Sequence, residues 1–208
     1  MADFNLHCFA LSGNSYKVAL FLNLANLDWN PIFVDYLGGE TKSIEWRRRI
    51  NKFGEVPVLE HGGLKICQSA VILNYLTEIT SQFGPKNEYE RREILEWLFF
   101  DNHKFTSYYA TLRYMYGLES KDNEVTDFLR NKVQSAFEVV DHHLIGKKFM
   151  VSNRITVVDI SMAGYIYMPE QIGLDLEKYK NIEAWKKRIM KITGWKHPYE
   201  LMPGPTAL

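Results

Sequence analysis

The chain has 208 residues, 46% of them hydrophobic and 14% aromatic, which is enough to bury a core of its own. Lysine plus arginine and aspartate plus glutamate number 25 each, so there is no excess of positive charge for a nucleic acid or an anionic membrane. No apolar run approaches the ~20 residues of a membrane-spanning helix. The composition predicts a soluble, cytoplasmic protein without nucleic-acid or membrane partners.

The first part of the sequence predicts a strand, a helix and a second strand. Every second residue is apolar from Phe4 to Ala10, and the polar loop 11–15 ends this pattern. Apolar residues then recur at helical spacing over 18–25, and extended character returns at 29–34.

The next part predicts a hairpin and a helix. Residues 40–53 are charged and weakly patterned, a valine-rich strand follows at 56–60, and 64–67 pairs back with it across a Gly-Gly turn. An apolar helix ends this part. The order of elements predicts an α/β domain, a small mixed sheet covered by helices, over residues 1–80.

The remainder of the chain is predicted to be helical. Residues 81–87 are rich in turn formers and are the predicted linker. Residues 88–116 read as one long helical stretch, and an apolar stripe marks another helix at 125–144. We predict an all-α second domain over 88–208, with a loose proline-rich tail.

Thr156 and Asp159 have the spacing of a capping box. The helix that this box opens is predicted to run through Tyr167. It is apolar on nearly every side, so it belongs in the middle of a helical bundle.

Cysteine and histidine usage predicts neither redox chemistry nor metal binding by the chain itself. Cys8 and Cys67 form no CxxC pair, so we expect two buried, unreactive thiols. Among the six histidines only His142 and His143 are adjacent, and neighbouring helix positions point in different directions. No metal site is predicted.

Val56 and Pro57 stand at the start of the predicted third strand. Proline has no backbone N–H, so it belongs at a strand's first residue, at an edge or at a bulge. A trans bond, the commoner form, would simply open the strand. A cis bond would turn the N–H and C=O of Val56 outward, where they could hold an extended peptide.

Gln68 and Ser69 lie where a strand leads into a helix. The Ser69 hydroxyl and the first N–H groups of that helix would point to one place, and helix N-termini attract carboxylates. The alternative is that Ser69 only caps its own helix while Gln68 is solvated.

The loop after the first strand offers the same choice between a cap and a site. Ser15 or Asn14 can cap the first helix, which leaves the Ser12 hydroxyl available to a ligand. If a thiol lay above the loop, a hydrogen bond from Ser12 and the helix N-terminus would both favour the thiolate. Lowering a thiol pKa by ~2 requires ~2.7 kcal/mol, and a hydrogen bond to a charged group supplies roughly 1.5–3 kcal/mol.

Together these motifs resemble the glutathione transferase family over essentially the whole chain. They are SGNSYKV, then NKFGEVPVLEHGGLKICQSAVILNYL, then RITVVDISMAG after the linker. The resemblance implies a thioredoxin-like N-terminal domain, an all-helical C-terminal domain and a homodimer. The segment GGETKSIEW and the second motif look most like phi-type and related bacterial members.

The resemblance implies glutathione as cosubstrate and a role for several residues. Val56, before a cis Pro57, would hold the cysteinyl backbone of glutathione. Gln68 and Ser69 would bind the γ-glutamyl carboxylate, and Lys42 would pair with the glycyl carboxylate.

Three positions bear on the chemistry of the resemblance. Ser12 matches the thiolate-stabilising serine of the serine-type classes. Asn14 replaces the cysteine of the isomerase (zeta) class and resembles an asparagine of bacterial glutathione-dependent disulfide reductases, so it could share the work of Ser12. Glu55 replaces the usual glutamine of the phi-like pattern, and this second carboxylate near an anionic ligand could weaken binding or shift a pKa.

The long helix carries many aromatic residues, most of which we expect to pack inward. In the family the C-terminal half of this helix lines a cleft for the electrophile. His103, Tyr108 and Tyr109 are the predicted cleft residues, because their polar tips suit a half-wet pocket.

We therefore predict a glutathione S-transferase that conjugates the glutathione thiolate to small hydrophobic electrophiles, in detoxification. One alternative is a glutathione-dependent disulfide reductase that uses the same site. Another is a non-catalytic binding or assembly module of this fold. Such modules usually lose the Gln-Ser pair or the loop hydroxyl, and both are present here.

Overall fold

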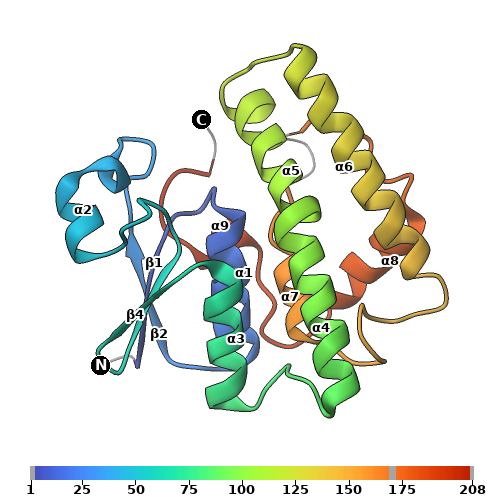
Figure 1. Cartoon of the computed structure of the whole chain (residues 1–208), viewed down its shortest axis with the longest axis horizontal. Helices are drawn as coiled ribbons and strands as arrows, with labels where there is room; N and C mark the ends of the chain where they lie inside the picture. The colour runs from blue at the N-terminus through green and yellow to red at the C-terminus, as the bar shows by residue number, and fades with distance from the viewer. Residues whose placement is uncertain (1–2, 169–171, 207–208) are drawn as a thin grey trace. The chain divides into compact units, whose positions relative to one another are not determined.

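The computed structural model describes residues 3–168 and 172–206, which form two compact units (Figure 1). One unit runs up to Gln82 and also includes the residues from Thr193 on, and the other is Phe83–Ile192. The first contains a small mixed sheet and the second is helical, as the fold class predicted from the sequence requires. No helix in the described ranges is long and apolar enough to cross a membrane.

The sheet has four strands in the order β2-β1-β3-β4. They are β1 (Phe4–Cys8), β2 (Trp29–Phe33), β3 (Val58–His61) and β4 (Leu64–Cys67). β1 and β2 are parallel, and the β1–β3 and β3–β4 pairs are antiparallel. The hairpin between β3 and β4 turns at Gly62 (φ 56°) and Gly63 (φ 81°), left-handed conformations that glycine adopts without a steric cost. The predicted hairpin is confirmed.

Helices cover the sheet. Figure 1 shows α1 (Gly13–Leu24) and α3 (Ser69–Thr80) together on one side of it and α2 (Ile44–Arg49) on the other. The short helix η1 (Glu40–Lys42) precedes α2. Trp46 of α2 is 4% exposed and packs with Val34 and Val58, so the charged 40–53 segment is anchored by one apolar side chain.

The C-terminal tail corrects the sequence analysis, which placed it with the helical domain and expected it to be loose. The short helix α9 (Pro198–Leu201) packs against α1. The N–H of Ala10 donates to the carbonyl of Pro203 at 2.8 Å, and the Tyr16 hydroxyl donates to the carbonyl of Lys196 at 2.8 Å. These contacts make the tail part of the first unit.

The second unit is built from helical segments. They are α4 (Glu88–Phe100), η2 (Asp101–Phe105), α5 (Thr106–Leu112), η3 (Arg113–Leu118), α6 (Glu124–His143), α7 (Val157–Met162) and α8 (Lys180–Ile189). The predicted long stretch is helical throughout, but its η2 and η3 segments are π-helical. The predicted apolar stripe of α6 is buried from Leu129 onwards, whereas Val125 at its start is 52% exposed. α7 is also buried as expected, although it ends at Met162 rather than Tyr167.

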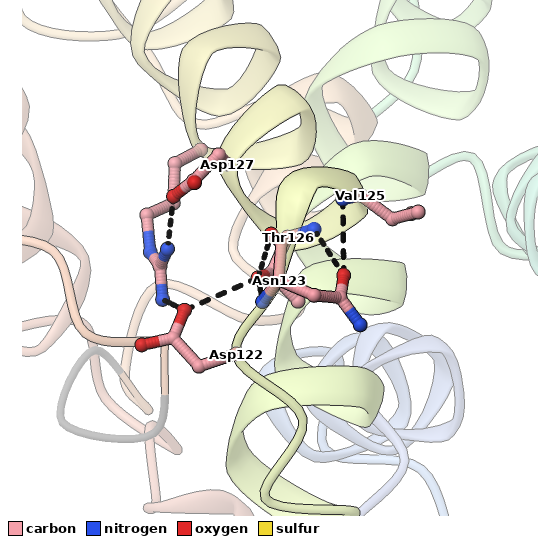
Figure 2. Close-up of polar contacts among 6 residues, drawn as sticks. Asp122, Asn123, Val125, Thr126 and Asp127 are labelled. Carbon is pink, nitrogen blue, oxygen red and sulfur yellow. Dashed lines mark hydrogen bonds and ion pairs between the residues drawn. The ribbon is translucent and has the colours of Figure 1, made fainter.

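The start of α6 is held by local polar contacts (Figure 2). The side-chain oxygen of Asn123 accepts from the N–H of Thr126 at 3.3 Å, and the Thr126 hydroxyl oxygen accepts from the N–H of Asn123 at 2.8 Å. Arg130 donates to Asp122 at 2.7 Å and to Asp127 at 2.6 Å. Reciprocal capping and this paired guanidinium fix the point at which the chain re-enters a helix after η3.

Asp159 is the buried polar centre of the helical unit. Its carboxylate is 0% exposed and accepts four hydrogen bonds. The donors are the N–H of Met150 (2.8 Å), the N–H (2.8 Å) and hydroxyl (3.0 Å) of Thr156, and the indole N–H of Trp185 (2.9 Å). The predicted capping box is therefore confirmed, and the same carboxylate also joins α7 to α8.

We expect Asp159→Asn to lower the free energy of unfolding by about 2–4 kcal/mol, because an amide NH2 must replace one oxygen and face two donors. Urea denaturation of the full chain measures this. Asp175→Asn is the matched control, since Asp175 is exposed and, among the residues that the structure describes, accepts only the N–H of Glu177, at 3.0 Å. Equal losses in the two variants would contradict the role given to Asp159.

Candidate functional site

Strand register brings three separate loops to one end of the sheet. Val58 is paired with His7 of β1 and with Cys67 of β4. The residues after β1, before β3 and after β4 therefore leave the sheet at the same end. The predicted ligand residues from Ser12 to Ser69 lie in these loops or in the segment that follows the parallel strand β2.

Ser12 is the N-cap of α1, which corrects the expectation that Ser15 or Asn14 would be the cap. Its hydroxyl oxygen accepts from the N–H of Ser15 at 3.1 Å, and the residue is 7% exposed. A hydroxyl that accepts a hydrogen bond keeps its own hydrogen for donation. Capping and donation to a ligand are therefore compatible roles for Ser12.

Asn14 links this loop to the start of α3. The hydroxyl of Ser69 donates to the side-chain oxygen of Asn14 at 3.5 Å, a long hydrogen bond. Ser69 is the first residue of α3 and is 6% exposed. Residues 55 positions apart in the sequence thus share one polar contact, and the first N–H groups of α3 lie beside it.

Gln68 holds an unfavourable backbone conformation. Its φ is 71° and its ψ 113°, in a region that residues other than glycine rarely occupy. Its side chain does not cap α3 but donates from Nε2 to the carboxylate of Glu55 at 2.9 Å. Backbone strain at a non-glycine residue is typical of functional sites, where surrounding contacts maintain it.

The segment before β3 carries Val56 and Pro57, joined by a cis peptide bond. The open choice between trans and cis is therefore resolved in favour of cis. β3 begins only at Val58, so Val56 lies outside the strand ladder. Its backbone N–H and C=O have no recorded hydrogen-bond partner among the described residues.

Asn51 positions this segment and was missed in the sequence analysis. It is 4% exposed, its amide nitrogen donates to the carbonyl of Glu55 at 2.9 Å, and its oxygen accepts from the N–H of Phe53 at 3.0 Å. An asparagine that bonds the backbone two residues on is typical of an Asx turn. The signal was available, since Asn51 stands shortly before Gly54, whose φ is 70°.

Lys42 lies at the end of η1 with an exposed side chain. No acceptor for its ammonium group is recorded among the described residues. The backbone beside Lys42 lies close to the loop before β3, since a Cβ added at Gly54 would be 2.9 Å from the carbonyl oxygen of Thr41.

The chain's own thiols are poor candidates for chemistry. Cys8 is 0% exposed, and burial raises the pKa of its thiol to about 12. Cys67, expected to be buried, is only half-buried, and it packs against the apolar cluster around Trp46. A thiol that reacts at neutral pH in this site would have to be supplied by a ligand.

Comparisons with known proteins show the family of this chain. The family model for the glutathione S-transferase N-terminal domain matches residues 5–78, and the model for the C-terminal domain matches residues 94–192. A glutathione S-transferase from Pseudomonas fluorescens is 30% identical, with a TM-score of 0.85 over 91% of this chain and 96% of its own. The chain belongs to the glutathione S-transferase family.

Other members of the family support this placement. Glutathione S-transferase F14 of Arabidopsis thaliana is 29% identical over 216 residues, which cover 94% of this chain and 83% of that protein. A glutathione transferase homolog from Lodderomyces elongisporus, solved with two GSH per subunit, is 20% identical, and its TM-score of 0.89 over 98% of this chain and 100% of its own shows the fold alone.

The helical unit of this glutathione S-transferase family member holds the three residues predicted for the electrophile. His103 is exposed in η2 and Tyr108 is half-buried in α5. Tyr109 is 1% exposed, and its ring packs 5.9 Å from that of Phe137 and 5.8 Å from that of Tyr165. Tyr109 therefore belongs to the interior of its unit, and its prediction as a half-wet cleft residue is corrected.

The strained backbone at Gln68 can be tested by two substitutions. We expect the free energy of unfolding of Gln68→Gly to be about 1 kcal/mol larger than that of Gln68→Ala, because glycine adopts a positive φ without steric strain and alanine does not. Urea denaturation provides both values. At Val71, an exposed position in the same helix, alanine should be the more stable replacement by about 1 kcal/mol. The same order at both positions would show that residue 68 is not strained.

Proposed function

We propose that this protein binds glutathione at the converging end of the sheet and conjugates its thiolate to small hydrophobic electrophiles. The observation that carries the proposal is the meeting of Ser12, Asn14 and Ser69 at the starts of α1 and α3. Two helix N-termini and three polar side chains there suit a ligand that is anionic at both its carboxylates and its thiolate.

Glutathione would lie along the loops in an extended form. The backbone of Val56, outside the ladder, would pair with the cysteinyl backbone as an added strand does. Ser69 and Gln68 would receive the γ-glutamyl carboxylate, and the ammonium of Lys42 would face the glycyl carboxylate. Pro57 would keep Val56 in place. Because proline has no backbone N–H, it needs no acceptor in the strand ladder itself.

The protein's chemical contribution would be to favour the thiolate. The hydroxyl hydrogen of Ser12 would point to the sulfur, and Asn14 could add a second donor from its amide nitrogen. One charge-assisted hydrogen bond supplies roughly 1.5–3 kcal/mol, comparable with the ~2.7 kcal/mol needed to lower a thiol pKa by ~2. The nucleophile itself belongs to glutathione, and the protein supplies orientation and charge stabilisation.

For the electrophile, the proposal keeps His103 and Tyr108, whose side chains are at least partly accessible within the helical unit. A cytoplasmic detoxification role and a homodimer complete the proposal. The two unpaired cysteines fit a reducing compartment. Light scattering on the purified chain tests the dimer.

We expect Ser12→Ala to raise the pKa of bound glutathione and to lower turnover at neutral pH by roughly 10- to 100-fold, because a hydrogen bond to the thiolate is lost. The same variant should lose about 1 kcal/mol of stability, since Ser12 also caps α1. The pH–rate profile with a chlorinated aromatic electrophile, and urea denaturation, measure the two effects.

A second variant separates the two roles of Ser12. Aspartate is a good N-cap but only accepts hydrogen bonds when ionised, so Ser12→Asp should keep the stability and lose the low thiol pKa. Ser15→Ala is the matched control, because the buried Ser15 hydroxyl has no hydrogen-bond partner in the described part of the chain and its removal should leave the profile unchanged. An unchanged profile in Ser12→Ala would remove Ser12 from the mechanism.

Calorimetric titration with reduced glutathione, in two buffers of different ionisation enthalpy, tests the proposal most directly. Binding with proton release supports thiolate formation in the site. Turnover of a small mixed disulfide in place of the aromatic electrophile would make the protein a disulfide reductase. An absence of glutathione binding would leave only a non-catalytic member of the fold.

A further inference from the structure

Positive charge is concentrated around α2, although the chain as a whole is balanced. The exposed cations of this segment, which we call the basic patch, are Lys42, Arg47, Arg48, Arg49 and Lys52. Glu45 is the only acidic residue within 42–52. The expectation of no membrane partner rested on the totals of 25 basic and 25 acidic residues, and such totals do not show a local excess.

The fold turns this segment outward. α2 covers the side of the sheet opposite α1 and α3, and its Trp46 is only 4% exposed (Figure 1). Because an α-helix turns by about 100° per residue, Ile44 and Arg48 lie on the face of α2 opposite Trp46. Ile44 is 70% exposed. An apolar side chain therefore lies at the outermost position of the basic segment, beside Arg48.

A second apolar side chain lies at the C-terminal end of the segment. Phe53 is 47% exposed, and the ammonium group of Lys52 lies 5.1 Å from the centre of its ring. A cation–π contact of this kind leaves the cation charged. The segment thus presents apolar and cationic groups together.

Most of the basic patch lacks an acidic partner. In the described ranges only Arg49 is ion-paired, with Glu45 at 3.1 Å, and the two side chains are 75% and 74% exposed. An ion pair as exposed as this is weak. By contrast, the exposed Arg91 and Arg92 of α4 both pair with Glu88, at 2.7 and 3.4 Å. The remaining cations of the patch therefore keep their full charge for an anionic partner.

A membrane surface with anionic phospholipids matches both kinds of group. Its phosphate groups attract arginine and lysine side chains, and the boundary below them accepts apolar side chains. A nucleic acid would match only the cations, because its phosphate backbone offers no apolar region for an aliphatic side chain such as Ile44. With six residues, α2 is too short to span a bilayer, so the contact would be peripheral.

We propose that Ile44 and the basic patch attach the protein reversibly to membranes that contain anionic phospholipids. Ile44 enters the head-group boundary, while Arg48 and its neighbours stay among the phosphate groups. Small hydrophobic electrophiles partition into membranes, so on the proposed function this attachment brings the protein to its substrates. The proposal replaces the expectation that the chain has no membrane partner.

Cosedimentation of the full chain with phospholipid vesicles tests the proposal. The vesicles contain phosphatidylcholine alone or phosphatidylcholine mixed with phosphatidylserine. We expect binding to the mixed vesicles only, and added salt should weaken it because salt screens exposed charges. No glutathione is required, so the result does not depend on the proposed function.

Charge reversal within the patch measures the electrostatic part of the binding. One basic side chain strengthens binding to an anionic membrane roughly fivefold, and Arg48→Glu changes the charge by two, so vesicle binding should weaken roughly 25-fold. Arg92→Glu makes the same change at an exposed position of α4 and should leave vesicle binding nearly unchanged. The circular dichroism spectrum verifies the fold of each variant.

Substitution of Ile44 separates a membrane from other polyanions. Ile44→Ser should weaken vesicle binding by about tenfold, because the insertion of an apolar side chain is lost. Ile145→Ser is the matched control, since Ile145 is 60% exposed in the helical unit, and it should bind like the wild type. A labelled single-stranded oligonucleotide at the same salt concentration should bind to none of these proteins.

Several results would overturn the inference. The wild type could fail to bind the mixed vesicles, it could bind both kinds of vesicle equally, or either Arg48→Glu or Ile44→Ser could bind like the wild type. Oligonucleotide binding that Arg48→Glu abolishes and Ile44→Ser retains, without vesicle binding, would assign the patch to a nucleic acid instead.

Discussion

The pairing of Val58 with both His7 and Cys67 brings together the three loops that carry most of the proposed glutathione contacts. Because side chains alternate between the faces of a sheet, a slip of one residue in either pair would move each side chain to the opposite face. Val58 and Leu59 are neighbours in β3 and both are 0% exposed, so each face has its own packed side chains and this packing enforces the register. The three loops then leave the sheet at one end, and no contact among them is needed to bring them together.

Polar groups at this end of the sheet stabilise the fold even without a ligand. Ser12 caps α1, and Asn51 holds the segment that leads into β3. Each of these side chains keeps a hydrogen that it can still donate to a further partner. A site built in this way is already organised without its ligand, so binding requires little reordering. The strained Gln68 is the exception, and its contact with Glu55 shows how the surrounding structure compensates for it.

Features with a local signal could be predicted from the sequence. The Gly-Gly hairpin and the Thr156–Asp159 capping box depend on residues within a few positions of one another. Other features depend on residues that only the fold brings together. The Glu55–Gln68 contact joins residues 13 positions apart, and the contact of Ala10 with Pro203 joins the two ends of the chain.

The difference between local signals and contacts made only by the fold also explains the wrong predictions for residues in the long helix. Aromatic residues of the long helix were expected to be mostly buried, but only Phe105 and Tyr109 are, while Tyr89, Phe99 and Tyr114 are exposed. Periodicity does not say which ring meets another helix. Tyr109 is buried because Phe137 of α6 and Tyr165 lie against it, and neither partner can be read from the helix that carries it. A polar tip alone is therefore weak evidence for a half-wet pocket.

The arrangement of charge explains why the nucleophile would come from the ligand. Burial holds the pKa of the Cys8 thiol near 12, so at neutral pH the protein's sulfur next to the loop stays protonated. A thiol outside the core avoids that desolvation and, on the proposed function, gains the Ser12 hydrogen bond and the α1 N-terminus instead. Desolvation and hydrogen bonding thus act in opposite directions on two sulfur atoms near one strand end. On the proposed function, the strand buries its own cysteine for stability while the loop beyond it favours the thiolate of a bound cosubstrate.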